Sequence, residues 1–279
     1  MDFDGIWIKT EKMRIATGLD LLEAEELFSV FEHHLQINPN GQGRPDKLNV
    51  KQIFLMALVY LRHNLTFEFL SLAFEIDDAT VQRWIEKAEK SLEDSLIELG
   101  TLPQVITENC KKLKELEIKD TSVLIDGAEQ PVRIPKDKDA QKQCYSGKKR
   151  HTQKILIFSD PKKTIIAITE VYVGSSHDFG IYKCENISQF IPKDKVVLVD
   201  NGFEGVEKNL PENKIKKPKI KTRGKQLNGG EKFNNKRITI ERVKVEHAIG
   251  GMKRYRIVPD IWRNISRDIN RTHKAVYGI

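Results

Sequence analysis

Three acidic residues lie where their carboxylates could do chemistry. Asp126 and Asp200 each follow a short apolar run, so we expect both at strand ends, and Glu246 lies in a segment with helical periodicity. Side chains at strand ends point into crevices where ligands collect, and carboxylate oxygens are the ligands that Mg²⁺ prefers. Converging acids could hold two such ions roughly 4 Å apart, which activate water against a phosphodiester.

Each acid also has a simpler interpretation. An Asp after a strand is commonly a turn residue, and Asp200 precedes Asn201 and Gly202, which favour a turn. Glu246 lies four residues after Arg242, the spacing of an ion pair on a helix. The acids alone therefore leave a metal site and ordinary structural roles both open.

The charge of the chain is uneven. The net charge of the 279 residues is +7, but residues 211–279 contain 19 Lys and Arg against 6 Asp and Glu, whereas residues 1–210 contain 28 against 34. A basic region of this kind either binds a polyanion, most often nucleic acid, or is a solvated face that keeps the protein in solution. Charge alone does not decide between the two.

Composition and motifs exclude several classes of protein. No run approaches the roughly 18 apolar residues of a membrane span, and the N-terminus lacks an apolar signal segment. The phosphate-binding patterns GxGxxG and GxxxxGK[ST] do not occur. The cysteines show no CxxC pair, so neither a disulfide framework nor a zinc site is predicted for Cys110, Cys144 and Cys184. We expect a reduced, cytoplasmic protein without a membrane partner.

Residues 20–36 and 49–98 show apolar side chains at helical spacing. The second segment predicts three helices, with Thr66 capping the second and a tight turn near residues 75–77, which is a helix-turn-helix arrangement. A plain three-helix bundle has the same periodicity, and residues 44–100 carry 7 basic against 10 acidic side chains, which disfavours tight phosphate contact. In the DNA-binding interpretation the third helix exposes Thr80, Gln82, Arg83 and Lys87 to a major groove.

After residue 118 the pattern changes to short apolar runs rich in β-branched residues, which predict strands. Consecutive strands followed by strand–helix alternation indicate a mixed sheet with flanking helices. We expect the strands within residues 121–126, 154–159, 164–174 and 195–200, and helices within 176–191 and 233–255.

Six segments in chain order resemble bacterial DDE transposases of insertion sequences, and the first of them, residues 43–92, resembles the helix-turn-helix that precedes their catalytic domains. "LIDGAEQPV" and "LVDNGFEGV" resemble the two aspartate motifs, and "RVKVEHAIGGMKRYRI" resembles the glutamate motif. "YSGKKRHTQKILIFSD" and "GSSHDFGIY" resemble the segments around the second and third strands. The resemblance implies an α+β or α/β chain: a helical segment and linker at 1–42, an all-α helix-turn-helix domain at 43–100, and a ribonuclease-H-like mixed sheet with flanking helices at 118–279.

The glutamate motif is the most specific of these segments. Family members often show Tyr, Arg, Glu and Lys separated by two, three and six residues, and Thr239, Arg242, Glu246 and Lys253 have this spacing. Thr replaces Tyr, which puts in doubt whatever stacking or positioning the tyrosine provides but removes no metal ligand. Residues 242, 246 and 253 would share one helix face, so Arg242 and Lys253 would flank the glutamate and hold DNA phosphates.

The resemblance implies a transposase. Asp126, Asp200 and Glu246 would be catalytic and hold two Mg²⁺ ions, for which Mn²⁺ could substitute. The enzyme would cut double-stranded transposon ends and join the 3′-hydroxyl to target DNA, acting as a homo-oligomer on the nucleoid. The basic side chains that would bind the DNA backbone next to the cut are Lys148, Lys149, Arg150 and Lys154.

Two other functions stay open, a domesticated metal-dependent DNA endonuclease and a catalytically inert DNA-binding regulator. His177 and Asp178 would have an auxiliary role in catalysis or DNA contact, although His177 could equally cap a helix. The last residues, 272–279, begin a helical pattern that family members usually continue, so we expect a shortened C-terminus.

Overall fold

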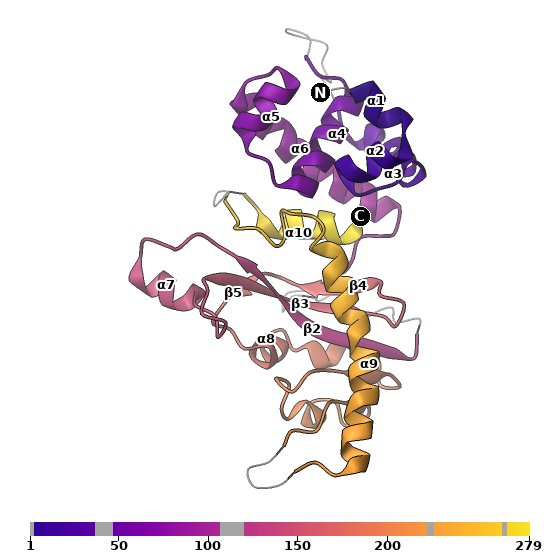
Figure 1. Ribbon diagram of the computed structural model, residues 1–279, viewed down its shortest axis with the longest axis vertical. Coiled ribbons are helices and arrows are strands. Elements are labelled where there is room, and N and C mark those ends of the chain that lie inside the picture. Colours follow the sequence, from indigo (N-terminus) through magenta and orange to yellow (C-terminus); the bar gives the residue numbers. More distant parts are fainter. Residues whose placement is uncertain (1–2, 37–46, 107–119, 222–225, 264–266) are drawn as a thin grey trace. The chain divides into compact units, whose positions relative to one another are not determined.

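The computed structural model describes residues 3–36, 47–106, 120–221, 226–263 and 267–279 (Figure 1). Contacts divide the chain into a helical unit, Met1–Leu102 with Met252–Ile279, and a sheet unit, Pro103–Gly251. The expected catalytic range of 118–279 therefore differs from this division at its C-terminal end. Most of the expected linker before residue 43 lies outside the described residues.

The helical unit begins with α1 (Phe3–Ile8), α2 (Thr10–Thr17) and α3 (Leu21–His34). The helix expected from residue 20 onwards is confirmed. Asp20 caps it, because its carboxylate accepts a hydrogen bond from the Glu23 amide while the Glu23 carboxylate accepts one from the Asp20 amide. The apolar pattern of the sequence does not predict α1 and α2, because helices this short show too little periodicity.

The three helices expected between residues 49 and 98 are α4 (Val50–His63), α5 (Phe67–Phe74) and α6 (Asp78–Glu98). The Thr66 hydroxyl caps α5 as predicted. Glu75 adopts the left-handed conformation, with φ of 56°, and this makes the turn between α5 and α6 tight. The predicted pair of helices joined by a tight turn is therefore present.

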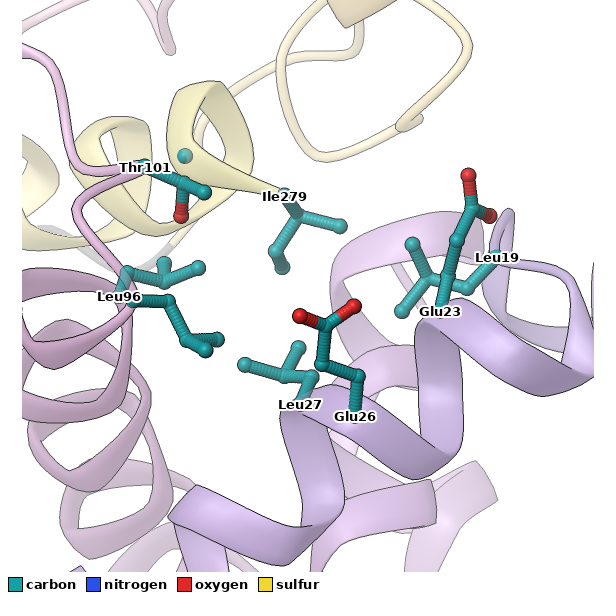
Figure 2. A pocket seen from close by; sticks show the side chains of 9 residues that line it. Leu19, Glu23, Glu26, Leu27, Leu96, Thr101 and Ile279 are labelled. Carbon is teal, nitrogen blue, oxygen red and sulfur yellow. The ribbon is translucent and has the colours of Figure 1, made fainter.

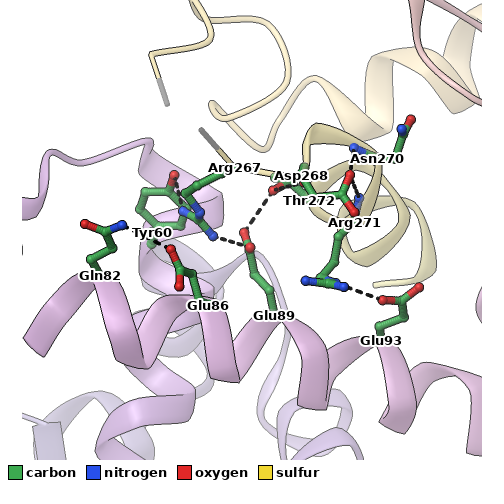
Figure 3. Close-up of polar contacts among 10 residues, drawn as sticks. All are labelled: Tyr60, Gln82, Glu86, Glu89, Glu93, Arg267, Asp268, Asn270, Arg271 and Thr272. Atoms are coloured by element: carbon green, nitrogen blue, oxygen red, sulfur yellow. Dashed lines mark hydrogen bonds and ion pairs between the residues drawn. The ribbon is translucent and has the colours of Figure 1, made fainter. Parts of the chain in front are cut away.

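A C-terminal helix, α10 (Ile269–Gly278), packs on the C-terminal half of α6 (Figure 3). The buried side chains of Arg267 and Glu89 form an ion pair. Arg267 also donates to the Tyr60 hydroxyl at 2.8 Å, and the Thr272 hydroxyl donates to Glu89 at 2.9 Å. This packing is the physical reason why the end of the chain belongs to the helical unit and not to the sheet unit.

One buried histidine makes the stability of the helical unit depend on pH. His273 is 2% exposed, and burial lowers its pKa to about 4 from the ordinary 6.5. The unfolded chain binds a proton at this ring below about pH 6.5, so the stability contributed by neutral His273 is present above that pH and is lost as the pH falls toward 4. Acidification from pH 7 to 5 is expected to lower the free energy of unfolding by about 2 kcal/mol.

Urea titrations followed by tryptophan fluorescence measure this effect in the helical unit alone, because all three tryptophans, Trp7, Trp84 and Trp262, belong to it. His273→Gln lacks the titrating ring and should show a pH slope that is smaller by about the same amount. Equal slopes in the two proteins would contradict the assignment.

A cavity of about 170 Å³ lies between α3, the end of α6 and the last residues of the chain (Figure 2). Leu19, Leu27 and Leu96 line it together with the carboxylates of Glu23 and Glu26. The lining combines aliphatic side chains with two carboxylates and the Thr101 hydroxyl and contains, among the described residues, no His, Cys or Lys, so we regard the cavity as a packing feature of the helical unit.

The sheet unit contains a mixed seven-stranded sheet, as the sequence predicts. Its order is β1-β4-β3-β2-β6-β7, with β5 also paired to β3. β2, β3 and β4 are antiparallel neighbours, whereas β6 and β7 run parallel to β2. The strands are β1 (Gln104–Ile106), β2 (Ser122–Pro131), β3 (Thr152–Ser159), β4 (Ile165–Thr169), β5 (Tyr172–Val173), β6 (Val196–Leu198) and β7 (Lys214–Lys216).

Two strand predictions need correction. β2 continues to Pro131, so Asp126 lies inside the strand and not at its end. The run 164–174 forms two short strands, β4 and β5, that pair with different parts of β3. The apolar pattern could not show this break, because the break involves a contact between separate strands. The Thr169 hydroxyl at the end of β4 accepts a hydrogen bond from the Leu156 amide of β3.

The helical elements of this unit are α7 (Lys138–Cys144), α8 (Asp178–Cys184), the short 3₁₀ helices η1 (Ile187–Phe190) and η2 (Val206–Lys208), and α9 (Gly229–Met252). The core lies between one sheet face and α8, where Val123 and Ile125 of β2 pack with Ile181 and Tyr182. The expected helix at 176–191 is interrupted at Asn186, which is left-handed. No helix in the described ranges is long and apolar enough to cross a membrane.

Candidate active site

Asp126 and Asp200 lie side by side in the sheet unit. β2 and β6 are parallel, and Leu124 of β2 pairs with Leu198 of β6. Each aspartate comes two residues after its leucine, and side chains alternate between faces, so both carboxylates lie on the sheet face opposite Ile125. β6 ends at Leu198, whereas β2 continues to Pro131, so Asp126 lies inside a strand and Asp200 follows one.

Local hydrogen bonds orient both aspartates. Asp126 Oδ1 accepts from the Gly127 amide, and Asp200 Oδ1 accepts from the Gly202 amide, each at 2.8 Å. Burial raises the pKa of Asp126 above its ordinary value, and the nearby negative charge of Asp200 acts in the same direction. The first aspartate is therefore a partly buried carboxylate that needs a positive partner.

Arg242 of α9 is that partner. Its Nη2 lies 3.7 Å from Asp126 Oδ2, and the two side chains are 15% and 19% exposed. Glu246 lies one helical turn later on the same face of α9 and is exposed. The expected common face does not extend to Lys253, because α9 ends at Met252 and Lys253 is an exposed residue of the helical unit.

The donor chemistry of the site suits a hard divalent cation. Asp126 and Asp200 offer carboxylate oxygens, the ligands of Mg²⁺ and Mn²⁺, and the Asp126 carboxylate already attracts the guanidinium of Arg242. Among the described residues, no three His, Cys, Asp or Glu side chains are grouped closely enough to hold a metal ion. The exposed Glu246 carboxylate would have to turn toward the aspartates to complete such a group.

Lys154 is not an exposed DNA-binding side chain in this structure. It is 12% exposed, its Nζ lies 2.9 Å from Asp178 Oδ1, and it donates to the Ser176 carbonyl at 2.8 Å. Its cross-strand neighbour is Glu129, whose Oε1 lies 3.9 Å away. Strand side chains alternate between faces, so Gly127 and Glu129 lie on the face of β2 opposite Asp126. The cluster of Lys154, Glu129 and Asp178 therefore lies on the sheet face opposite the Asp126 carboxylate.

The absence of a side chain at Gly127 leaves room for the Asp178 carboxylate. A Cβ at this position would lie 2.8 Å from Asp178 Oδ2, so the aspartate packs directly on the glycine. Sequence reasoning missed Gly127 and Glu129. Their spacing of two in a strand that contains Asp126 is a signal that could have placed them together on the other face.

His177 occupies the N-cap position of α8, but its exposed side chain makes no capping hydrogen bond. Asp178 is the first residue of the helix and is held by Lys154. His177 therefore occupies the predicted capping position, but its side chain does not make the predicted capping contact.

The basic stretch forms a hairpin closed by a bridge between Tyr145 and His151. Lys148, Lys149 and Arg150 are exposed at its tip. The Lys148 side chain reaches back along β2, because its Nζ lies 3.2 Å from Oε1 of Glu129, three residues beyond Asp126.

The α6 side chains expected in a DNA groove lie on the N-terminal half of the helix. Gln82, Arg83 and Lys87 are exposed, whereas the Thr80 hydroxyl donates to Asp77 at 2.7 Å and belongs to the helix cap. The hydrogen bonds that Thr272 and Arg271 of α10 donate to α6 fall on the other half of α6, at Glu89 and Glu93. The N-terminal face is thus accessible within the helical unit.

Comparisons with known proteins agree with these features. Residues 125–279 match the model of the "DDE superfamily endonuclease" family, and residues 46–97 match "Helix-turn-helix of DDE superfamily endonuclease". The chain is 30% identical over 240 residues to a protein of Microchaete diplosiphon described as "Probable transposase for insertion sequence element IS702", covering 85% of this chain and 82% of that one. No solved structure matches the chain.

Proposed function

The chain belongs to the DDE superfamily endonucleases of insertion sequences, and from this premise we propose that it cuts the ends of its own element and joins them to target DNA. The observation that carries the proposal is the pair of partly buried aspartates, Asp126 and Asp200, each two residues after the paired Leu124 and Leu198 and close enough for their charges to interact. α9 brings Arg242, and one turn later Glu246, to that face.

In the proposed reaction Asp126, Asp200 and Glu246 would hold two Mg²⁺ ions, for which Mn²⁺ could substitute. Bound ions would supply an activated water for hydrolysis and would stabilise the leaving oxygen of the phosphodiester. The protein contributes the orientation of its carboxylates, through the Gly127 and Gly202 amides. No Ser, Tyr or Cys nucleophile is required, because the freed 3′-hydroxyl itself attacks the target strand.

The proposal assigns separate surfaces to double-stranded DNA. Gln82, Arg83 and Lys87 of α6 would read or touch the element ends, and Lys148, Lys149 and Arg150 of the hairpin would bind the DNA backbone next to the cut. The mixed sheet supports assignment of the catalytic core to the ribonuclease-H-like class. A homo-oligomer on the nucleoid would bring the two ends together.

The test is incubation of the full chain with DNA that carries the element's own flanking sequences. Strand cleavage at the ends with Mg²⁺ or Mn²⁺, none in EDTA, and joined products with a target plasmid are the expected results. Cleavage without joining would favour a domesticated endonuclease. Tight binding with no cleavage under any metal would overturn the proposal in favour of an inert regulator.

The hairpin gives a prediction about salt dependence. Lys148→Ala combined with Lys149→Ala removes two exposed cations, and each lost phosphate contact should reduce the slope of log affinity against log salt by about 0.9. We expect binding of all DNA sequences to weaken together and the slope to flatten by about 2, as measured by fluorescence anisotropy at several salt concentrations.

The matched control is Lys162→Ala combined with Lys163→Ala. These adjacent lysines follow the other end of β3, and Lys163, like Lys149, has a positive φ. The control should keep the wild-type slope. An unchanged slope in the hairpin variant, or an equal flattening in both, would contradict a phosphate-binding role for the hairpin.

A further inference from the structure

The guanidinium of Arg242 lies where a positive charge is most needed. Burial disfavours the ionised form of Asp126 and Asp200 adds negative charge nearby, whereas the hydrogen bond from the Gly127 amide and the positive charge of Arg242 oppose both in part. Removing this partner without a substitute would leave a partly buried carboxylate without compensation, which is costly. Arg242 therefore does for Asp126 part of what a bound divalent cation would do.

The contact between Arg242 and Asp126 is incomplete as a hydrogen-bonded pair. The closest nitrogen–oxygen distance is 3.7 Å, longer than a hydrogen bond, and among the described residues the buried Nε of Arg242 has no hydrogen-bond partner. A guanidinium in a bidentate pair would use two N–H groups. The arrangement is an electrostatic contact that a stronger cation, or a better acceptor for Arg242, can replace.

Arg242 has a second suitable acceptor if the chain acts on DNA. A guanidinium stays charged at every relevant pH and binds phosphate with the same fork geometry as carboxylate. α9 also presents the exposed Glu246 one turn away, so DNA whose phosphate reaches this acid passes close to Arg242. A divalent cation at Asp126 would repel the guanidinium, and a phosphate would attract it.

We propose that Arg242 is the resident counter-ion of Asp126 and exchanges this carboxylate for a DNA phosphate when a divalent cation binds. The inference rests on the proposed function, because it needs a cation at the aspartates and DNA beside them. Its consequence is linkage: the cation raises the affinity for DNA, and DNA raises the affinity for the cation by the same factor.

The first experiment measures Mn²⁺ binding to the full chain without DNA, from the electron paramagnetic resonance signal of free Mn²⁺. Arg242→Gln removes the competing charge and should bind Mn²⁺ about tenfold more tightly. Arg242→Lys keeps a cation and should stay near wild type. Arg237→Gln makes the same charge change at an exposed position of the same helix and should have little effect.

The second experiment measures DNA affinity by anisotropy in Ca²⁺ and in EDTA, with the recovered DNA shown to be intact. In the wild type, Ca²⁺ should strengthen binding. In Arg242→Gln this gain should be about tenfold smaller, because linkage makes it equal to the change in cation affinity. The gain in Arg237→Gln should match the wild type.

The outcomes separate this inference from the proposed function. Unchanged or weaker Mn²⁺ binding in Arg242→Gln, with circular dichroism showing a folded protein, would overturn the counter-ion role. An equal Ca²⁺ gain in wild type and Arg242→Gln would overturn the exchange. If Asp200→Asn binds Mn²⁺ as tightly as the wild type, the cation is not at the aspartates, and the metal site of the proposed function itself is wrong.

Discussion

Replacing Asp200 with Asn is expected to abolish metal-dependent cleavage while leaving the fold and DNA binding in place. The carboxylate lies at the end of β6 beside Asp126, and its Oδ1 accepts from the Gly202 amide at 2.8 Å. An amide oxygen can keep that hydrogen bond but has no charge to hold a divalent cation. Metal catalysis contributes several kcal/mol, so the rate of end cleavage should fall by about a thousandfold or more.

Single-turnover cleavage of labelled end DNA measures the loss, and anisotropy in EDTA measures binding, which should change only a few-fold. Asp194→Asn is the matched control, because Asp194 precedes β6 at its other end and its side chain is 77% exposed. The control should cleave like the wild type. Substantial cleavage by Asp200→Asn would show that this aspartate is not part of the catalytic machinery.

The second large effect is on stability. Arg267→Ala should destabilise the helical unit by about 3 to 5 kcal/mol, because Glu89 then becomes a buried charge without its ion-pair partner. The Arg267 and Glu89 side chains are 3% and 4% exposed, and burial already raises the pKa of Glu89, which Arg267 opposes. The arginine also stacks over the Tyr60 ring at 5.1 Å, so its removal costs packing as well.

Urea unfolding followed by tryptophan fluorescence measures this loss in the helical unit. Arg256→Ala is the control, since Arg256 pairs with Asp260 at the surface, with a side chain that is 62% exposed, and should cost less than about 1 kcal/mol. The double change Glu89→Leu with Arg267→Met removes both charges and should recover most of the loss. A double variant as unstable as the sum of its single changes would contradict the explanation.

The sequence by itself determined most of the local elements. A capping residue such as Thr66 acts on neighbouring amides, so it can be predicted from adjacent residues, and the structure confirms it. Short apolar runs rich in β-branched residues predicted the strands, and the order of strands and helices predicted the mixed sheet that is present. The order of the motifs predicted the family, which the comparisons confirm.

Only the tertiary structure decided which charges meet. Arg242 could pair with Glu246 by spacing, but its ion pair in the structure is with Asp126, 116 positions earlier in the chain. From the sequence, Lys154 was predicted to bind DNA together with the other cations of its basic stretch. Its position on β3 instead places its ammonium group between the carboxylates of Glu129 and Asp178. Strand register and helix packing fix such pairs, and both depend on contacts between distant segments that no local pattern encodes.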